Sequence, residues 1–116
     1  MPQTTTAVRY GSSHGPQQHV ETGVPLAALL PASALAITDR KNDQLAFAVL
    51  ATGADGYAAL VSYGEFSPEF GNRGVLVAIT EDGRQLDRPR LVVPGDVKGG
   101  RYVSDLIGLR VARVIP

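Results

Sequence analysis

Thirteen glycines and eight prolines interrupt a chain of only 116 residues. Proline cannot donate to a β-ladder and glycine supports sharp turns, so this density predicts short strands joined by many turns instead of long helices. Hydrophobic residues make up 44% of the chain, whereas aromatic residues make up 6% and tryptophan is absent. We therefore predict a single domain over residues 1–116 with an aliphatic core and a strand-dominated α+β fold.

Short runs of β-branched and apolar residues predict seven or eight strands. The run 45–51 is apolar on both faces of a period-2 pattern, which predicts a central strand buried on both sides. Asp82 and Gly83 supply the positive φ angles of a tight hairpin turn. The expected strands cover residues 7–10, 19–22, 45–51, 57–63, 75–80, 90–93 and 109–115, with a further strand starting at 85.

Two or three short helical segments complete the expected fold. Residues 23–30 predict a short helix, with Pro25 in its first turn and Leu26, Leu29 and Leu30 on one face. Residues 64–71 predict a helical turn in which Phe66 and Phe70 pack inward, and residues 102–106 predict another turn. Residues 32–38 fit either a further helical turn or a connector, and the polar run 39–43 is expected to be exposed.

Charge is unevenly distributed although the formal net charge is zero. Residues 1–83 carry four cations and eight acids, whereas residues 84–116 carry seven cations and three acids. This asymmetry fits either an anion site in the last third of the chain or a solvated basic face. It is too mild for a nucleic-acid surface, so we expect no nucleic-acid partner.

The chain contains no cysteine. Disulfides, a thiolate nucleophile, zinc ribbons and iron–sulfur clusters are therefore excluded within it. No apolar run reaches the roughly 20 residues of a membrane span, and the polar start has no signal-peptide pattern. As it stands the chain is expected to be cytoplasmic, but the compartment stays open, and a longer gene would allow export.

The segment from Arg90 to Val103 is the strongest candidate for a binding site. A short strand ends at Pro94, and the loop that follows carries Lys98, two glycines and Arg101. Glycine-rich loops flanked by cations can hold an anion through backbone N–H groups. The alternative is an ordinary strand, turn and solvated basic loop, which the local chemistry favours.

Four segments in order resemble the oxidoreductase molybdopterin-binding domain, the catalytic domain type of sulfite oxidase and its bacterial relatives. They are residues 22–26 with Leu29 and Leu30, residues 52–57, residues 75–78 with Asp82 and Gly83, and residues 90–103, and together they span roughly residues 8–114. The closest likeness is to small single-domain members. The resemblance implies the mixed-sheet fold of that family, with the family's N-terminal strand and helix missing here.

The resemblance also implies a set of cofactor-binding residues. The positions that would hold the pyranopterin and its phosphate are Arg90, Lys98, Gly99, Gly100 and Arg101. The alternative for Arg90 is a salt bridge that fixes the strand end. Tyr57 lies where the family places a residue near the metal pocket, but we favour a packing role with its hydroxyl bonded to backbone. No catalytic residue is assigned.

The main departure from the family concerns the metal. The family's enzymes hold molybdenum by the cofactor's dithiolene and one protein cysteine, which this chain lacks. His14 and His19 are the only histidines, and their pattern is too weak to assign them as metal ligands. No metal site is therefore predicted, and molybdopterin itself is either a bound cofactor or absent.

Three functions stay open on these grounds. The first is a molybdopterin-binding-like module that holds a cofactor or anion without sulfite-oxidase-type turnover. The second is a molybdenum-dependent oxidoreductase, or a subunit of one, with a non-thiolate metal site. The third is a structural or interaction domain without cofactor. Expected partners are a pterin or other small anion and, with no residue-level support, a second copy or a redox chain.

Overall fold

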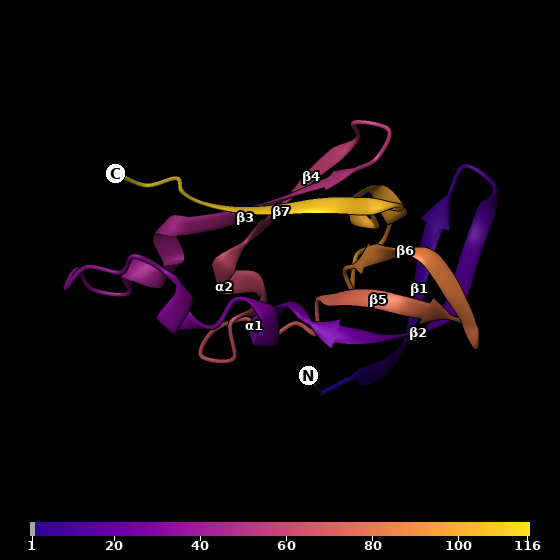
Figure 1. Cartoon of the computed structure of the whole chain (residues 1–116), viewed down its shortest axis with the longest axis horizontal. Coiled ribbons are helices and arrows are strands. Elements are labelled where there is room, and N and C mark those ends of the chain that lie inside the picture. The colour runs from indigo at the N-terminus through magenta and orange to yellow at the C-terminus, as the bar shows by residue number, and fades with distance from the viewer. Residues whose placement is uncertain (1) are drawn as a thin grey trace.

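A computed structural model describes residues 2–116 and contains two antiparallel sheets that face each other across one core (Figure 1). One sheet has four strands in the order β1-β2-β5-β6, and the other has three in the order β4-β3-β7. The described part of the chain measures 44 × 28 × 24 Å. The strands are β1 (Thr4–Ser12), β2 (Gly15–Pro25), β3 (Phe47–Gly53), β4 (Ala58–Ser62), β5 (Leu76–Glu81), β6 (Arg84–Val92) and β7 (Leu106–Arg113).

The strand-dominated α+β class predicted from the sequence is confirmed. Helical structure in residues 2–116 is limited to single turns. The finer expectation, the arrangement of the molybdopterin-binding family, stays a prediction. The helical segments are α1 (Leu26–Leu29), α2 (Tyr63–Phe66) and the 3-10 turns η1 (Ala32–Ala34), η2 (Asp43–Ala46) and η3 (Gly99–Arg101).

The hairpin of β1 and β2 is the longest pairing in the molecule. Ser12 pairs with Gly15, so Ser13 and His14 form a two-residue loop, and Gly15 closes it at a φ of 95°. Strand β2 then continues to Pro25 and pairs with β5 on its other edge. The hairpin was predicted, but as two four-residue strands, because the polar residues at its tip have no hydrophobic pattern.

A close backbone approach fixes β2 against β5. The ladder shifts register between Thr22 and Gly23, and a Cβ at Gly23 would lie 2.0 Å from the carbonyl oxygen of Val77. No real side chain tolerates that distance. Gly23 is therefore required by the packing of the two strands, which sets the positions of the residues before it in β2.

Two further hairpins follow the expected turns. Asp82 and Gly83 join β5 to β6 with φ angles of 52° and 81°, as a tight type I′ turn requires. Strands β3 and β4 form the predicted hairpin, with β3 central in its sheet. Residues of β3 alternate between buried and half-buried, so the expectation of burial on both faces is wrong. The reason is that one face of β3 packs on the core while the other is only partly covered.

The expected helices are shorter than predicted or absent. Residues 23–25 belong to β2, and α1 keeps one turn in which Leu26 is fully buried. Phe66 is buried as expected, but Phe70 is exposed, because α2 ends before it. The prediction of a helical turn at residues 102–106 is wrong, because the only turn of helix in this part of the described chain is η3, at Gly99–Arg101. For residues 32–38, the structure shows one 3-10 turn, η1.

The core is mainly aliphatic and draws on both sheets. Val49 and Val61 from the three-stranded sheet and Leu76 and Leu91 from the four-stranded sheet are almost fully buried. Near α2, Tyr63 packs edge-on to Phe66 at a centroid distance of 4.8 Å and donates its hydroxyl to the backbone. No helix within residues 2–116 has the length and apolar character needed to cross a membrane, in line with the prediction of no membrane span.

Asp43, expected to be exposed, is instead a buried anchor. Arg113 donates to both of its carboxylate oxygens, at 2.9 and 2.6 Å, and Thr38 donates through its backbone and its hydroxyl. These donors hold the pKa of the Asp43 carboxyl well below its ordinary value, with the Arg113 hydrogen bonds as the largest cause. The pair ties η2 to the last strand, a contact 70 residues apart that local sequence cannot reveal.

We expect Gly23→Ala to destabilise the protein strongly. The new methyl group must push β2 from β5, at a cost of about 1–3 kcal/mol or more. Gly108→Ala is the matched control, because a Cβ at Gly108 meets no atom within 4 Å. Urea unfolding of both variants measures the difference, and equal midpoints for the two variants would contradict the close approach.

We also expect Asp43→Asn to weaken the acid sensitivity of the fold. The pKa of Asp43 is lowered on folding, so its stabilisation is complete above the ordinary value of 3.8 and is lost as pH falls below it. The variant should melt at a lower temperature at pH 7, and the gap to the unmodified protein should narrow as pH falls from 4 toward 2. A gap that stays constant over this range would show that Asp43 is not the titrating group.

Candidate functional site

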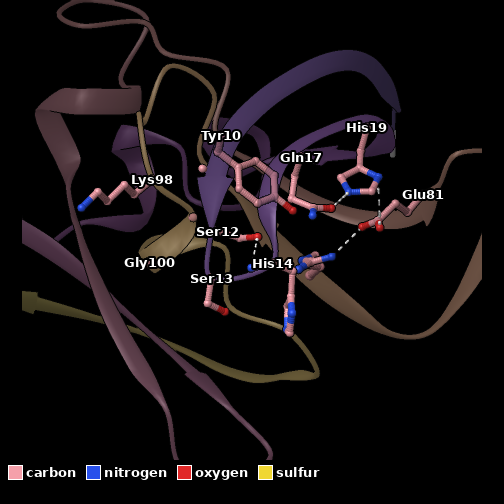
Figure 2. Close-up of a pocket in the computed structure, with 12 residues that line it drawn as sticks. Tyr10, Ser12, Ser13, His14, Gln17, His19, Glu81, Lys98 and Gly100 are labelled. Carbon is pink, nitrogen blue, oxygen red and sulfur yellow. Dashed lines mark hydrogen bonds and ion pairs between the residues drawn. The ribbon is translucent and has the colours of Figure 1, made fainter.

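An open cavity of about 810 Å³ lies between the tip of the β1–β2 hairpin and the loop before η3, and we call it the hairpin cavity (Figure 2). It contains four of the five residues predicted from the sequence to bind a cofactor. Those four are Arg90, Lys98, Gly99 and Gly100, and the other lining residues are Tyr10, Gly11, Ser12, Ser13, His14, Gln17, His19 and Glu81.

Arg90 lies in the wall of the cavity and is already paired. Its guanidinium donates to Glu81 at 2.7 Å across the β5–β6 hairpin, while its Nε–H is buried without an acceptor in the described part of the chain. The salt bridge considered as the alternative for Arg90 is therefore present. A ligand anion at Arg90 must share the guanidinium with Glu81.

Arg101 does not line the hairpin cavity. It makes a two-pronged ion pair with Asp96, at 2.8 Å to each oxygen, and a second pair with Glu65 at 2.9 Å. The pKa of Asp96 is lowered chiefly by the Arg101 hydrogen bond. Burial alone would raise the pKa of Glu65, but the Ser62 backbone and Arg101 outweigh it and lower that pKa. Arg101 therefore ties its loop to α2, and the structure does not bring it to the other predicted residues.

The loop from Lys98 to Gly100 is fixed against the hairpin by backbone contacts. Gly11 donates its N–H to the Val97 carbonyl at 2.7 Å, and a Cβ at Gly99 would lie 2.7 Å from the Tyr10 ring. Gly99 is thus needed for packing, whatever it binds. Tyr57 donates its hydroxyl to the Gly100 carbonyl at 2.5 Å, as expected, but the expected packing role is wrong, because the residue is 52% exposed.

Lys98 differs from the two arginines because its side chain makes no hydrogen bond or ion pair within residues 2–116, while its backbone forms an isolated bridge with Gly11. Figure 2 shows its side chain on the opposite side of Tyr10 from His19 and Glu81. Lys98 thus lines the opposite end of the hairpin cavity from Glu81, and in Figure 2 its side chain extends away from Tyr10.

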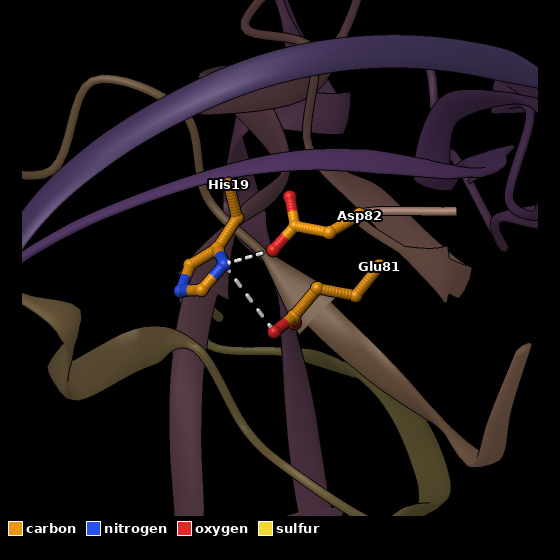
Figure 3. A group of neighbouring side chains, drawn as sticks. All are labelled: His19, Glu81 and Asp82. Atoms are coloured by element: carbon orange, nitrogen blue, oxygen red, sulfur yellow. Dashed lines mark hydrogen bonds and ion pairs between the residues drawn. The ribbon is translucent and has the colours of Figure 1, made fainter. Parts of the chain in front are cut away.

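The end of the cavity near Glu81, which we call the carboxylate end, contains residues that the sequence analysis did not assign to a site. His19 Nδ1 lies 2.6 Å from Asp82 Oδ2 and 3.5 Å from Glu81 Oε1, as Figure 3 shows. Asp82 also accepts the Val20 backbone N–H at 2.8 Å through its other oxygen. The β5–β6 turn is thereby joined to the middle of β2.

Glu21 is the deepest charged group in this region, with 1% of its surface exposed. It stands opposite Glu81 in the β2–β5 register. Burial raises the pKa of the Glu21 carboxyl to about 7, and the charge of Glu81 and a hydrogen bond to it act in the same direction. Arg90 and His19 act against this rise and only partly offset it.

Tyr10, which lines the cavity, packs against the buried ring of Tyr102. The rings of Tyr10 and Tyr102 lie 4.1 Å apart, and the Tyr102 hydroxyl is buried without a partner in the described chain. Burial raises the pKa of Tyr102 to about 12, so its hydroxyl is neutral near pH 7.

One sequence signal could have located the missed residues. Gln17, His19 and Glu21 recur with period 2, so they share one face of a strand. In β2 that face is the inward one, while Val20 is 46% exposed. Polar residues on the inward face of a strand are costly unless they are paired, and they often mark a site.

We expect Glu21→Gln to stabilise the protein at alkaline pH. Between about pH 4.5, its ordinary pKa, and pH 7 the folded protein retains a proton that the unfolded chain has released. The free energy of unfolding of the unmodified protein therefore falls as pH rises through this interval. In chelator-containing buffer, the variant should melt higher at pH 8, with a difference that shrinks toward pH 4.5. Asp87→Asn, at an exposed position, is the control, and a difference independent of pH would be contrary to a buried, proton-holding Glu21.

Comparison with known proteins adds no assignment: no protein-family model matches the chain, and no curated protein matches it. The resemblance to the molybdopterin-binding family therefore rests on the four sequence segments alone and stays a prediction.

Proposed function

We propose that the chain is a small binding module that holds an anionic ligand of about pterin size in the hairpin cavity, without catalytic turnover of its own. The observation that carries the proposal is the convergence of Arg90, Lys98, Gly99 and Gly100 on one cavity.

The dimensions and polarity of the cavity support such a ligand. A volume of about 810 Å³ lies within the usual range of small-molecule pockets. Lys98 is an uncommitted cation at one end, and the loop tip adds the hydroxyl of Ser13 and the imidazole of His14. Because Lys98 already lacks a partner in the described chain, binding an anion there would break no existing ion pair.

The residues fit the organic part of a molybdopterin better than its metal. Lys98 and the adjacent glycines could receive a phosphate, and the carboxylate of Glu81 could accept N–H groups of a pterin ring. When bound, such a group would supply the dithiolene that holds molybdenum. This chain offers no thiolate to complete the metal's coordination, so we assign it binding and not sulfite-oxidase-type turnover.

Titration calorimetry with a phosphorylated pterin, and separately with inorganic phosphate, tests the proposal. We expect saturable binding of the pterin, with phosphate alone weaker. Lys98→Ala should weaken binding about tenfold, since a hydrogen bond to a charged group contributes roughly 1.5 kcal/mol or more.

Arg88→Ala is the matched control, because Arg88 is exposed on β6 outside the cavity lining. It should leave the affinity unchanged. Absence of binding at millimolar concentrations of both probes, or equal losses in the Lys98 and Arg88 variants, would overturn the proposal.

A further inference from the structure

The carboxylate end of the hairpin cavity has the geometry of a metal site. One imidazole nitrogen and two carboxylate oxygens, from His19, Glu81 and Asp82, all lie within 4.8 Å of one another. Figure 3 shows that the same nitrogen, Nδ1, faces both carboxylates. Metal–ligand distances of about 2.1 Å place tetrahedral zinc ligands about 3.4 Å apart, so small side-chain rotations would be sufficient to form a site.

The second nitrogen of His19 is positioned as metal-binding histidines require. His19 Nε2 lies 3.0 Å from Gln17 Oε1, an amide oxygen that accepts a hydrogen bond. A proton held on Nε2 by Gln17 leaves the lone pair of Nδ1 free to bind a metal. Such a partner on the far nitrogen accompanies almost all metal-ligating histidines.

An independent feature behind this cluster also points to a missing cation. Glu21 is almost completely buried, yet its Oε1 has no hydrogen-bond partner in the described chain. Its side chain leaves the same face of β2 as His19 and lies against Glu81. A buried carboxylate oxygen is costly to leave unpaired, and a cation next to Glu81 would offset that cost.

The nearby arginines leave room for the ion. Arg90 contacts Glu81 through Oε2, whereas His19 faces Oε1, so the ion pair and a metal would use different oxygens. Arg84, which also acts on Asp82, is exposed. Two carboxylates, Glu81 and Asp82, thus face His19 with the carboxyl group of Glu21 behind them, against one partly buried guanidinium.

We propose that His19 Nδ1, Glu81 Oε1 and Asp82 Oδ2 bind a divalent transition metal such as Zn²⁺ or Co²⁺, with Gln17 as a positioning residue and Glu21 as the supporting buried carboxylate. Mixed imidazole and carboxylate donors suit these ions better than Mg²⁺, which prefers oxygen ligands and keeps its waters. The metal takes the place of the proton that His19 shares with Asp82. The site does not depend on anion binding at Lys98.

Titration of the chelator-treated 116-residue chain with Zn²⁺ tests the inference, with Co²⁺ absorption as a report on coordination. We expect one equivalent to bind at micromolar or lower concentration. Gln17→Ala should lose about 10–100-fold in affinity, as outer partners of metal ligands do, and His19→Gln at least as much. Asp82→Asn should also weaken binding, while it keeps the turn, because asparagine tolerates positive φ.

His14→Gln is the matched control, because His14 lines the same cavity but lies outside the cluster. Its affinity for Zn²⁺ should be unchanged. A two-bond ¹H–¹⁵N spectrum of the zinc form should show His19 with its proton on Nε2. Lack of saturable binding below about 100 μM, equal losses for His14→Gln and His19→Gln, or a proton on Nδ1 in the zinc form would overturn the site. If the unmodified protein binds zinc but no phosphorylated pterin, the result contradicts the proposed anion-binding function and leaves the metal site standing.

Discussion

The hairpin cavity depends on the direction in which β2 presents its side chains. Gly23 allows β2 to approach β5 closely, and the register before it turns His19 and Glu21 inward while Val20 faces solvent. Burying a carboxylate and exposing a valine opposes the hydrophobic effect, so the aliphatic core must supply the compensating stability. That compensation lets a small domain keep a charged cluster beside its core.

Ion pairs divide the basic residues of the last third of the chain into two groups. Arg101 and Arg113 fasten loops and strands together through Asp96 and Asp43, so their role is structural. Arg90 lines the cavity and also forms an ion pair with Glu81, whereas Lys98 lines the cavity and has no ion-pair partner in the described chain. Three of the seven basic residues noted in the last third of the sequence, Arg90, Arg101 and Arg113, are therefore held in ion pairs within the described chain, and of the other four only Lys98 lines the cavity.

Local patterns predicted the fold class, the hairpin turn at Asp82 and Gly83, and the central position of β3. These patterns failed where contacts between residues far apart in the sequence determine the structure, as at Asp43, whose partner Arg113 lies 70 residues away. The same difference between local and long-range contacts explains which parts of the candidate site were predicted. The loop around Lys98 was predicted because it is contiguous, whereas the His19 cluster was missed because β2 and the β5–β6 turn meet only in the folded chain.

The inward face of β2 is the claim on which the account rests, and thiol accessibility measures it directly. The chain has no cysteine, so Val20→Cys and Glu21→Cys each introduce a single thiol. In the folded protein a maleimide reagent should label the cysteine at position 20 rapidly and the one at position 21 only after denaturation. Fast labelling at position 21 together with protection at position 20 would mean that β2 faces the other way and that the cluster does not form.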